Sequence, residues 1–223
     1  MNTDIKLILP NTKMGVVLDL KEGERLYFLA GPIRGNENWR AKAISLLHEK
    51  DPFCYIACPH PYATDHELSR FQIKPTELPR STDDERESPK YALPFENQTM
   101  WERYYLERAS YYGSVIFWLP CEDKLNPRKE GPYARDTYGE LPRWSLKSAN
   151  PDFFSFSKSN YSSKVVNLTI GAEKDFPGLS VIQKNLNADH GSEFIIYQTL
   201  EETISEAVRK GKKVNPQRMD FND

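Results

Sequence analysis

Two glutamates stand out among the residues that could do chemistry. Glu140 follows the apolar run 114–120 after a polar loop, and the sequence predicts that it opens a helix just past a buried parallel strand. Open α/β sheets bind ligands at that edge. The N–H groups of a first helical turn and the helix dipole would keep Glu140 ionised, as a carboxylate nucleophile must be. The alternative is that Glu140 only caps its helix.

Glu102 is the second carboxylate of interest. It lies early in a helix predicted over 98–112, which runs antiparallel to the strand that follows it. The start of that helix should therefore lie at the same sheet edge as Glu140. Asp136, four residues before Glu140, could orient that glutamate, bind a ligand hydroxyl or cap the helix. These three acids are the candidate catalytic residues.

A turn after the first main strand is the candidate binding element. Gly31 and Pro32 directly follow the apolar run 26–30. Gly31 would let the backbone approach a ligand and Pro32 would stiffen the turn, although an ordinary strand-to-helix turn is the alternative. Ile33 comes next and is placed to touch a ligand. The chain has neither a dinucleotide fingerprint nor a Walker sequence, and its four histidines and three cysteines lack metal-ligand spacing. We expect no metal and no cofactor.

Strands and helices alternate along the chain. This order predicts an α/β protein: a flavodoxin-like (Rossmann-like) sandwich with a mostly parallel five-stranded sheet. The predicted strands are 26–30, 55–58, 114–120, 164–170 (ended by Gly171) and 194–197, and the predicted helices are 37–50, 98–112, 137–147, 178–187 and 200–210.

Segments outside this pattern define the domain limits. The apolar runs 4–9 and 14–19 flank a turn signal and predict an N-terminal β-hairpin. We therefore divide the chain into a hairpin extension (1–22), an α/β domain (23–213) and a C-terminal tail (214–223). The polar segment 62–96 and the aromatic loop 150–163 are candidates to cover the site.

An ordered set of motifs resembles the nucleoside 2-deoxyribosyltransferase family. The resemblance covers roughly residues 25–210. It consists of Phe-Leu-Ala-Gly-Pro-Ile at 28–33, Trp39, Trp101-Glu102, Phe-Trp-Leu-Pro at 117–120, and Tyr-Ala-Arg-Asp-Thr at 133–137 followed by Glu140 and Trp144.

This resemblance implies roles for two further residues. Arg135 and Thr137 match the family's Ala-Arg-x-Thr pattern. Arg135 would pair with a site carboxylate or a phosphate, and Thr137 would donate to the sugar or to Glu140. The alternatives are a surface ion pair and a helix cap. Pro142 departs from the family pattern, and because proline is tolerated in a first helical turn, we expect the helix to open at or near Glu140.

The activity implied by the resemblance is cleavage of the N-glycosidic bond of a 2′-deoxynucleoside. Glu140 would attack C1′ to form a deoxyribosyl ester, which a second nucleobase then opens. A water acceptor would make the protein a deoxynucleoside or deoxynucleotide hydrolase, and a chain that has lost turnover would be a nucleoside-binding module. The partners expected are a nucleoside or nucleotide, a free nucleobase and further copies of the chain in a homo-oligomer.

Composition sets the remaining expectations. A net charge of −2 gives no electrostatic argument for a nucleic acid polymer or a membrane surface. Cys54 and Cys58 are too far apart along one strand to form a disulfide, so we expect buried thiols in a reducing cytoplasm. Neither a secretory leader nor a run of about 20 apolar residues is recognisable.

Overall fold

The computed structural model describes residues 5–10, 14–16, 20, 23–36, 38–73, 92–94, 97–149 and 166–214. Most of the segment 62–96, the loop 150–163 and the predicted tail beyond residue 214 lie outside these ranges. Their predicted roles as covers of the site are not addressed by the structure.

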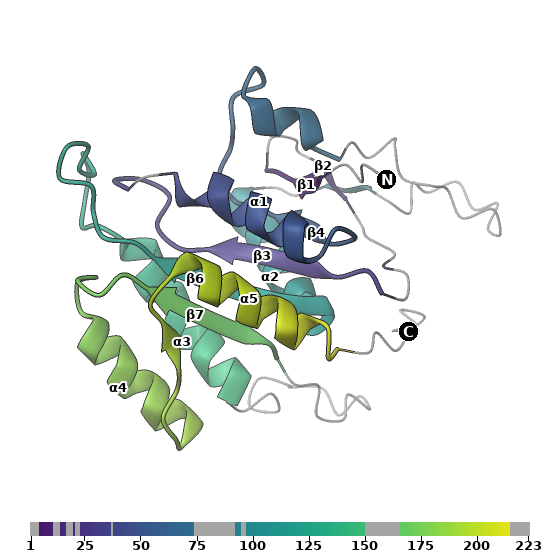
Figure 1. Ribbon diagram of the computed structural model, residues 1–223. Helices are drawn as coiled ribbons and strands as arrows, with labels where there is room; N and C mark the ends of the chain where they lie inside the picture. The colour runs from purple at the N-terminus through teal and green to yellow at the C-terminus, as the bar shows by residue number, and fades with distance from the viewer. Residues whose placement is uncertain are drawn as a thin grey trace.

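Within the described residues, the main sheet has six parallel strands in the order β1-β4-β3-β6-β7-β8 (Figure 1). The strands are short, and all except β8 are mostly buried, as expected for a parallel sheet covered on both faces. The strands are β1 (Lys6–Ile8), β3 (Leu26–Ala30), β4 (Tyr55–Ala57), β6 (Gly113–Leu119), β7 (Leu168–Ala172) and β8 (Ile196–Tyr197).

Helices cover both faces of this sheet. Alternate residues of β3 supply the two faces: Phe28 joins one apolar cluster and Leu29 the other. Figure 1 shows α1 and α5 on the near face of the sheet, with α2 and α3 behind it. The described helices are α1 (Trp39–Lys50), α2 (Gln98–Tyr112), α3 (Arg135–Ala149), α4 (Leu179–His190) and α5 (Leu200–Gly211), with a 3-10 turn at Glu67–Phe71. The predicted flavodoxin-like α/β class is confirmed.

The predicted N-terminal hairpin is wrong. Strand β1 pairs in parallel with β4, so it forms the edge of the main sheet and raises the predicted five strands to six. Strand β2 (Met14–Val16) instead pairs antiparallel with the distant strand β5 (Ala92–Pro94). The two apolar runs are close in sequence, but burial decides the pairing. Leu7 and Ile8 are buried when β1 extends the sheet.

Most other boundaries agree with the prediction, but β7 does not. The sequence places the end of this strand at Gly171, whereas the structure continues it through Ala172. A Cβ atom at Gly171 would lie 1.9 Å from Thr203 Oγ1 on α5. The glycine therefore permits close packing of helix on strand rather than ending the strand.

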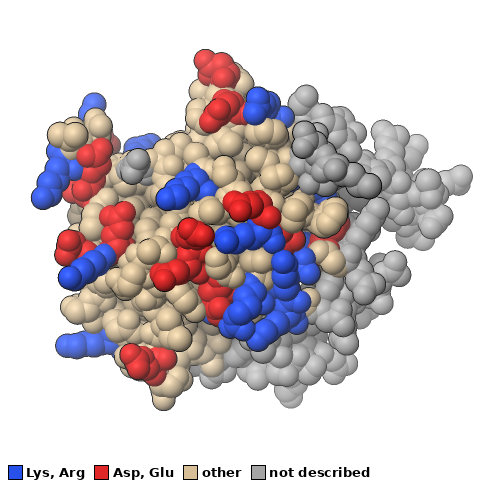
Figure 2. Space-filling model, viewed as in Figure 1, with Lys and Arg blue, Asp and Glu red and all other residues tan. Residues whose placement is uncertain are grey.

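The charged surface is mixed. Figure 2 shows acidic and basic side chains interspersed over the face that α1 and α5 cover. Positive charge gathers near the end of α5, where Arg209 forms an ion pair with Glu206 and Lys212 donates to the Lys50 carbonyl. Across the described ranges, no helix has the length and apolar character needed to cross a membrane.

Candidate active site

Glu140 lies inside helix α3 rather than at its start. The helix begins at Arg135 and contains Pro142 in its interior, so the expected opening near Glu140 is wrong. Pro142 removes only the N–H that would bond the Tyr138 carbonyl. Tyr138 is on an exposed side of the helix, where water can replace that donor. Helix α3 therefore continues through the proline.

The ionisation state expected for Glu140 also needs correction. Burial raises the pKa of Glu140 to about 7, and the charges of Glu102 and Asp136 add to that rise. A carboxylate in the second helical turn lacks the free N–H groups of the first turn, which would have favoured the ionised form. Near neutral pH, Glu140 can therefore either hold or release a proton.

Glu102 is positioned by the first two turns of helix α2. The Asn97 side chain caps this helix by accepting from the Met100 N–H at 3.0 Å. Gln98 Nε2 donates both to Glu102 Oε1 at 2.8 Å and to the Pro59 carbonyl after β4 at 3.1 Å. The start of α2 is thereby tied to the carboxyl end of a strand of the main sheet.

Glu102 and Glu140 form an interacting acid pair. Burial raises the pKa of Glu102, the hydrogen bond from Gln98 opposes that rise, and the charge of Asp136 adds to it. The charge of Glu102 in turn raises the pKa of Glu140. Two partly buried carboxyls that interact in this way titrate as a coupled pair. This combination is typical of acid–base sites.

Asp136 belongs to the same charge cluster but is itself exposed. Its carboxylate lies 3.2 Å from Arg135 Nε and 4.0 Å from Arg128 Nη2. Arg135 is exposed as well, whereas Thr137 is buried against the core. The structure therefore keeps Asp136 within electrostatic reach of Glu102 and Glu140 while its side chain forms surface ion pairs.

The turn at Gly31 and Pro32 is held from two sides. Gly31 has a φ of +138°, and a Cβ atom there would lie 2.2 Å from the Trp118 carbonyl oxygen of β6, so only glycine fits. From α1, Arg40 donates to the Gly31 carbonyl at 2.7 Å and to the Pro32 carbonyl at 2.8 Å. Ile33, next along the chain, is partly buried.

Arg40 links this turn to the acid pair, and sequence reasoning missed it. The charges of Arg40 and Glu102 act on each other, lowering the pKa of Glu102. Arg40 occupies the buried face of α1 together with Ala43, Ile44 and Leu47. A single arginine on an apolar stripe of helical spacing is the signal that could have revealed it.

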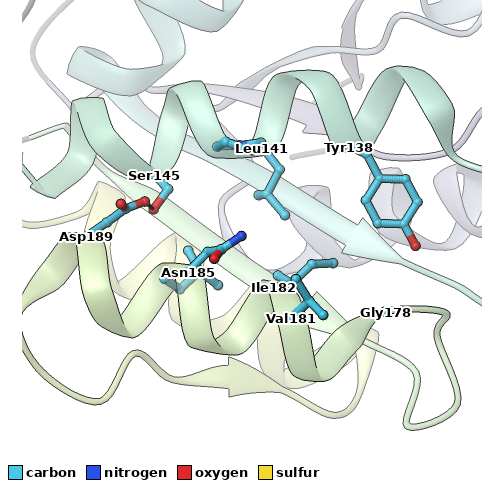
Figure 3. Close-up of a pocket in the computed structure, with 10 residues that line it drawn as sticks. Tyr138, Leu141, Ser145, Gly178, Val181, Ile182, Asn185 and Asp189 are labelled. Carbon is cyan, nitrogen blue, oxygen red and sulfur yellow. Dashed lines mark hydrogen bonds between the residues drawn. The ribbon is translucent and has the colours of Figure 1, made fainter.

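A pocket lies elsewhere, in a groove between α3 and α4 (Figure 3). Its volume is about 310 Å³. At one end, Ser145 on α3 donates a hydrogen bond to Asp189 on α4. The rest of the lining is mostly apolar and consists of Tyr138, Leu141, Pro142, Gly178, Val181, Ile182, Asn185 and Leu186. None of the sequence-predicted site residues lies in this groove.

Metal chemistry has no candidate ligand set here. Among the described residues, no three or more histidine, cysteine, aspartate or glutamate side chains are grouped so that they could hold a metal ion. Neither a scan against models of known protein families nor a search of curated proteins finds a match to this chain. The interpretation of the site therefore rests on its own residues and geometry.

Proposed function

We propose that this chain is a nucleoside 2-deoxyribosyltransferase-like enzyme that moves a deoxyribosyl group from one nucleobase to another. The observation that carries the proposal is the acid pair Glu102–Glu140, which is coupled through Arg40 to the Gly31–Pro32 turn. The turn follows the carboxyl end of β3, the edge where parallel sheets bind ligands.

The pair can supply both groups that the reaction needs. An ionised Glu140 oxygen attacks C1′, the C1′–N bond breaks, and its electron pair goes to the base nitrogen, which takes a proton from Glu102. The second base then attacks C1′ and releases the Glu140 carboxylate, while the proton lost by that base returns to Glu102. Each half-reaction inverts C1′, so the original anomer is restored, as in retaining glycosidases. Neither half-reaction calls for a metal or a redox cofactor.

The electrostatics determine which protonation form of the pair can react. A pKa of about 7 leaves about half of the Glu140 side chains ionised at neutral pH. Burial raises the pKa of Glu102, and an ionised Glu102 raises the pKa of Glu140, so the reactive form of the pair is the one in which Glu102 holds the proton and Glu140 has lost it. A pair that holds one proton between its two members has one nucleophile and one acid at the same time.

The substrates follow from this chemistry. They are a 2′-deoxynucleoside or deoxynucleotide and a free nucleobase, with Gly31, Pro32, Ile33, Arg135 and Thr137 as the proposed contacts. We expect a homo-oligomer, because transferases of the resembled family use residues from a neighbouring subunit. Free thiols at the three cysteines fit our expectation of a reducing cytoplasm.

A base-exchange assay tests the proposal. The protein is incubated with a purine deoxynucleoside and a different free base, and the products are separated by chromatography. A new deoxynucleoside that disappears with Glu140→Gln is the expected result. Free base without exchange would identify a hydrolase, and ligand binding without any product would identify a binding module. Either outcome would overturn the transferase assignment.

A further inference from the structure

Arg40 has an unusual environment for a charged residue. Its side chain is only 2% exposed. Its guanidinium lies over the Trp39 ring, 4.4 Å from the centroid, and donates to two backbone carbonyls. None of the ion pairs in the described part of the chain includes Arg40, and its buried Nε has no hydrogen-bond partner there.

This arrangement is costly if Arg40 serves packing alone. Burying a cation without a hydrogen-bonded carboxylate is destabilising in general, and an apolar side chain of the same size would avoid that cost. Burial accordingly lowers the pKa of Arg40 from its ordinary value. The two carbonyls that it binds, however, belong to Gly31 and Pro32, the turn at the proposed substrate edge.

The planar shape of the guanidinium suits it to holding the Gly31–Pro32 turn through two carbonyls. Two of its nitrogens each reach a different carbonyl of the same turn, at 2.7 Å and 2.8 Å. Trp39 Nε1 adds a weaker bond to the Pro32 carbonyl at 3.4 Å. A lysine ammonium is a point charge and cannot reproduce the planar fork. The turn is thereby fixed between α1 and the Trp118 carbonyl of β6.

The charge of Arg40 has a second effect, on one member of the acid pair. Arg40 lowers the pKa of Glu102, which lies on α2. The charges that act on Glu140 are instead those of Glu102 and Asp136, and both raise its pKa. The other titratable groups that act on Arg40 are Cys58 after β4, Tyr62 in the following loop and Tyr133 before α3, and Arg40 in turn lowers the pKa of His60 after β4.

We propose that Arg40 is a positioning residue of the active site: it clamps the Gly31–Pro32 turn so that a bound nucleoside is presented to Glu102 and Glu140. This inference rests on the proposed function. The two hydrogen bonds of the planar guanidinium hold the turn in place. Its positive charge lowers the pKa of Glu102. Arg40 itself touches neither the sugar nor the base.

Two substitutions of Arg40 separate the effect of its two hydrogen bonds on the turn from the effect of its positive charge on Glu102. Arg40→Met removes both and should lower kcat/KM by about 10- to 100-fold, because a small misplacement of a bound substrate has effects of that size. It should also move the limb of the pH profile that reports Glu102 to higher pH, since the favourable positive charge is gone. Arg40→Lys keeps the charge, so the profile should stay in place while kcat/KM still falls.

Arg25 provides the matched control. It is also mostly buried beside β3, but at the amino edge of the strand, where it pairs with Asp51 at 3.2 Å. Arg25→Met should lower the thermal unfolding temperature without changing the pH profile or KM of the folded protein. Thermal unfolding and base exchange are measured for all four proteins, the wild type included.

The outcomes are distinguishable. Wild-type protein that gives no product removes the proposed function, and this inference with it. Wild-type turnover with unchanged kcat/KM in folded Arg40→Met overturns the inference alone. Equal losses in Arg25→Met and Arg40→Met, with no movement of the pH profile, would also overturn it, because Arg40 would then be a structural residue only. If Arg40→Met does not fold, the kcat/KM and pH profile of Arg40→Lys decide the question.

Discussion

The two sides of helix α3 differ in their surroundings, one being charged and the other mostly apolar. The side that carries Glu140 places carboxyls beside those of α2, where burial and like charge raise their pKa. The side that carries Ser145 faces α4 across an apolar groove, where the polar Ser145–Asp189 contact is already satisfied. The groove has a volume of about 310 Å³, yet the charged side holds the groups that can transfer protons. Partly buried carboxyls with raised pKa are the reason that the proposed site lies on the charged side rather than in the groove.

The largest expected effect comes from removing the proposed nucleophile. Glu140→Gln should lower kcat/KM for base exchange by at least about 10³-fold, because the amide cannot form the ester. Ser145→Ala, on the other side of the same helix, is the matched control and should change kcat/KM by only a few-fold. Steady-state kinetics on both variants make the test. Equal losses would remove the distinction between the two sides of α3.

Removing the proposed acid should have the next largest effect. We expect Glu102→Gln to lower kcat/KM by about 10²- to 10³-fold, since general acid catalysis contributes effects of this order. A deoxynucleoside whose base is already cationic needs no protonation to leave and should recover most of the loss. If the cationic substrate is slowed as much as the neutral one, Glu102 is not the acid.

The pH dependence of kcat/KM tests which glutamate is the nucleophile and which is the acid. Because kcat/KM reports the free enzyme, an ionised Glu140 nucleophile predicts that kcat/KM rises with pH up to about 7, with a slope of about tenfold per unit well below it. If Glu140 were the acid, kcat/KM would instead fall as pH rises through 7. A profile measured from pH 5 to pH 9 gives the sign directly.

A smaller effect is expected on stability. The folded pKa of Glu140, about 7, lies above its ordinary value of 4.5, so the folded state binds more protons than the unfolded state between these values. The contribution of Glu140 to stability is complete below about pH 4.5 and is lost as pH rises through 7, by at most about 3 kcal/mol. Urea unfolding at pH 5 and pH 8 should therefore differ less for Glu140→Gln than for wild type.

An exposed groove residue provides the reference for that measurement. Val181 on α4 is 58% exposed and lines the groove rather than the acid pair. Val181→Ser should leave the difference between the two pH values as it is in the wild type. If this variant reduced the difference as much as Glu140→Gln does, Glu140 would not be the source of the pH dependence.

The comparison also shows where sequence reasoning works. Strand β3 and helix α2 have the bounds that hydrophobic pattern predicts, because a run of buried residues or a helical stripe is a local property. The Thr199 cap of α5 is equally local, because its hydroxyl accepts from the Glu202 N–H at 3.2 Å, only three residues away. The edge at which Gly31 should lie follows from strand direction alone.

What the sequence by itself determined is the α/β class, most of its helices and the placement of Glu102 early in α2. The tertiary structure decided three things. Strand β1 joined the main sheet, Glu140 acquired a raised pKa, and Arg40 bound the Gly31–Pro32 turn. The reason is the same in each case. Pairing, desolvation and charge coupling depend on groups brought together from distant parts of the chain, and hydrophobic periodicity carries information only about near neighbours.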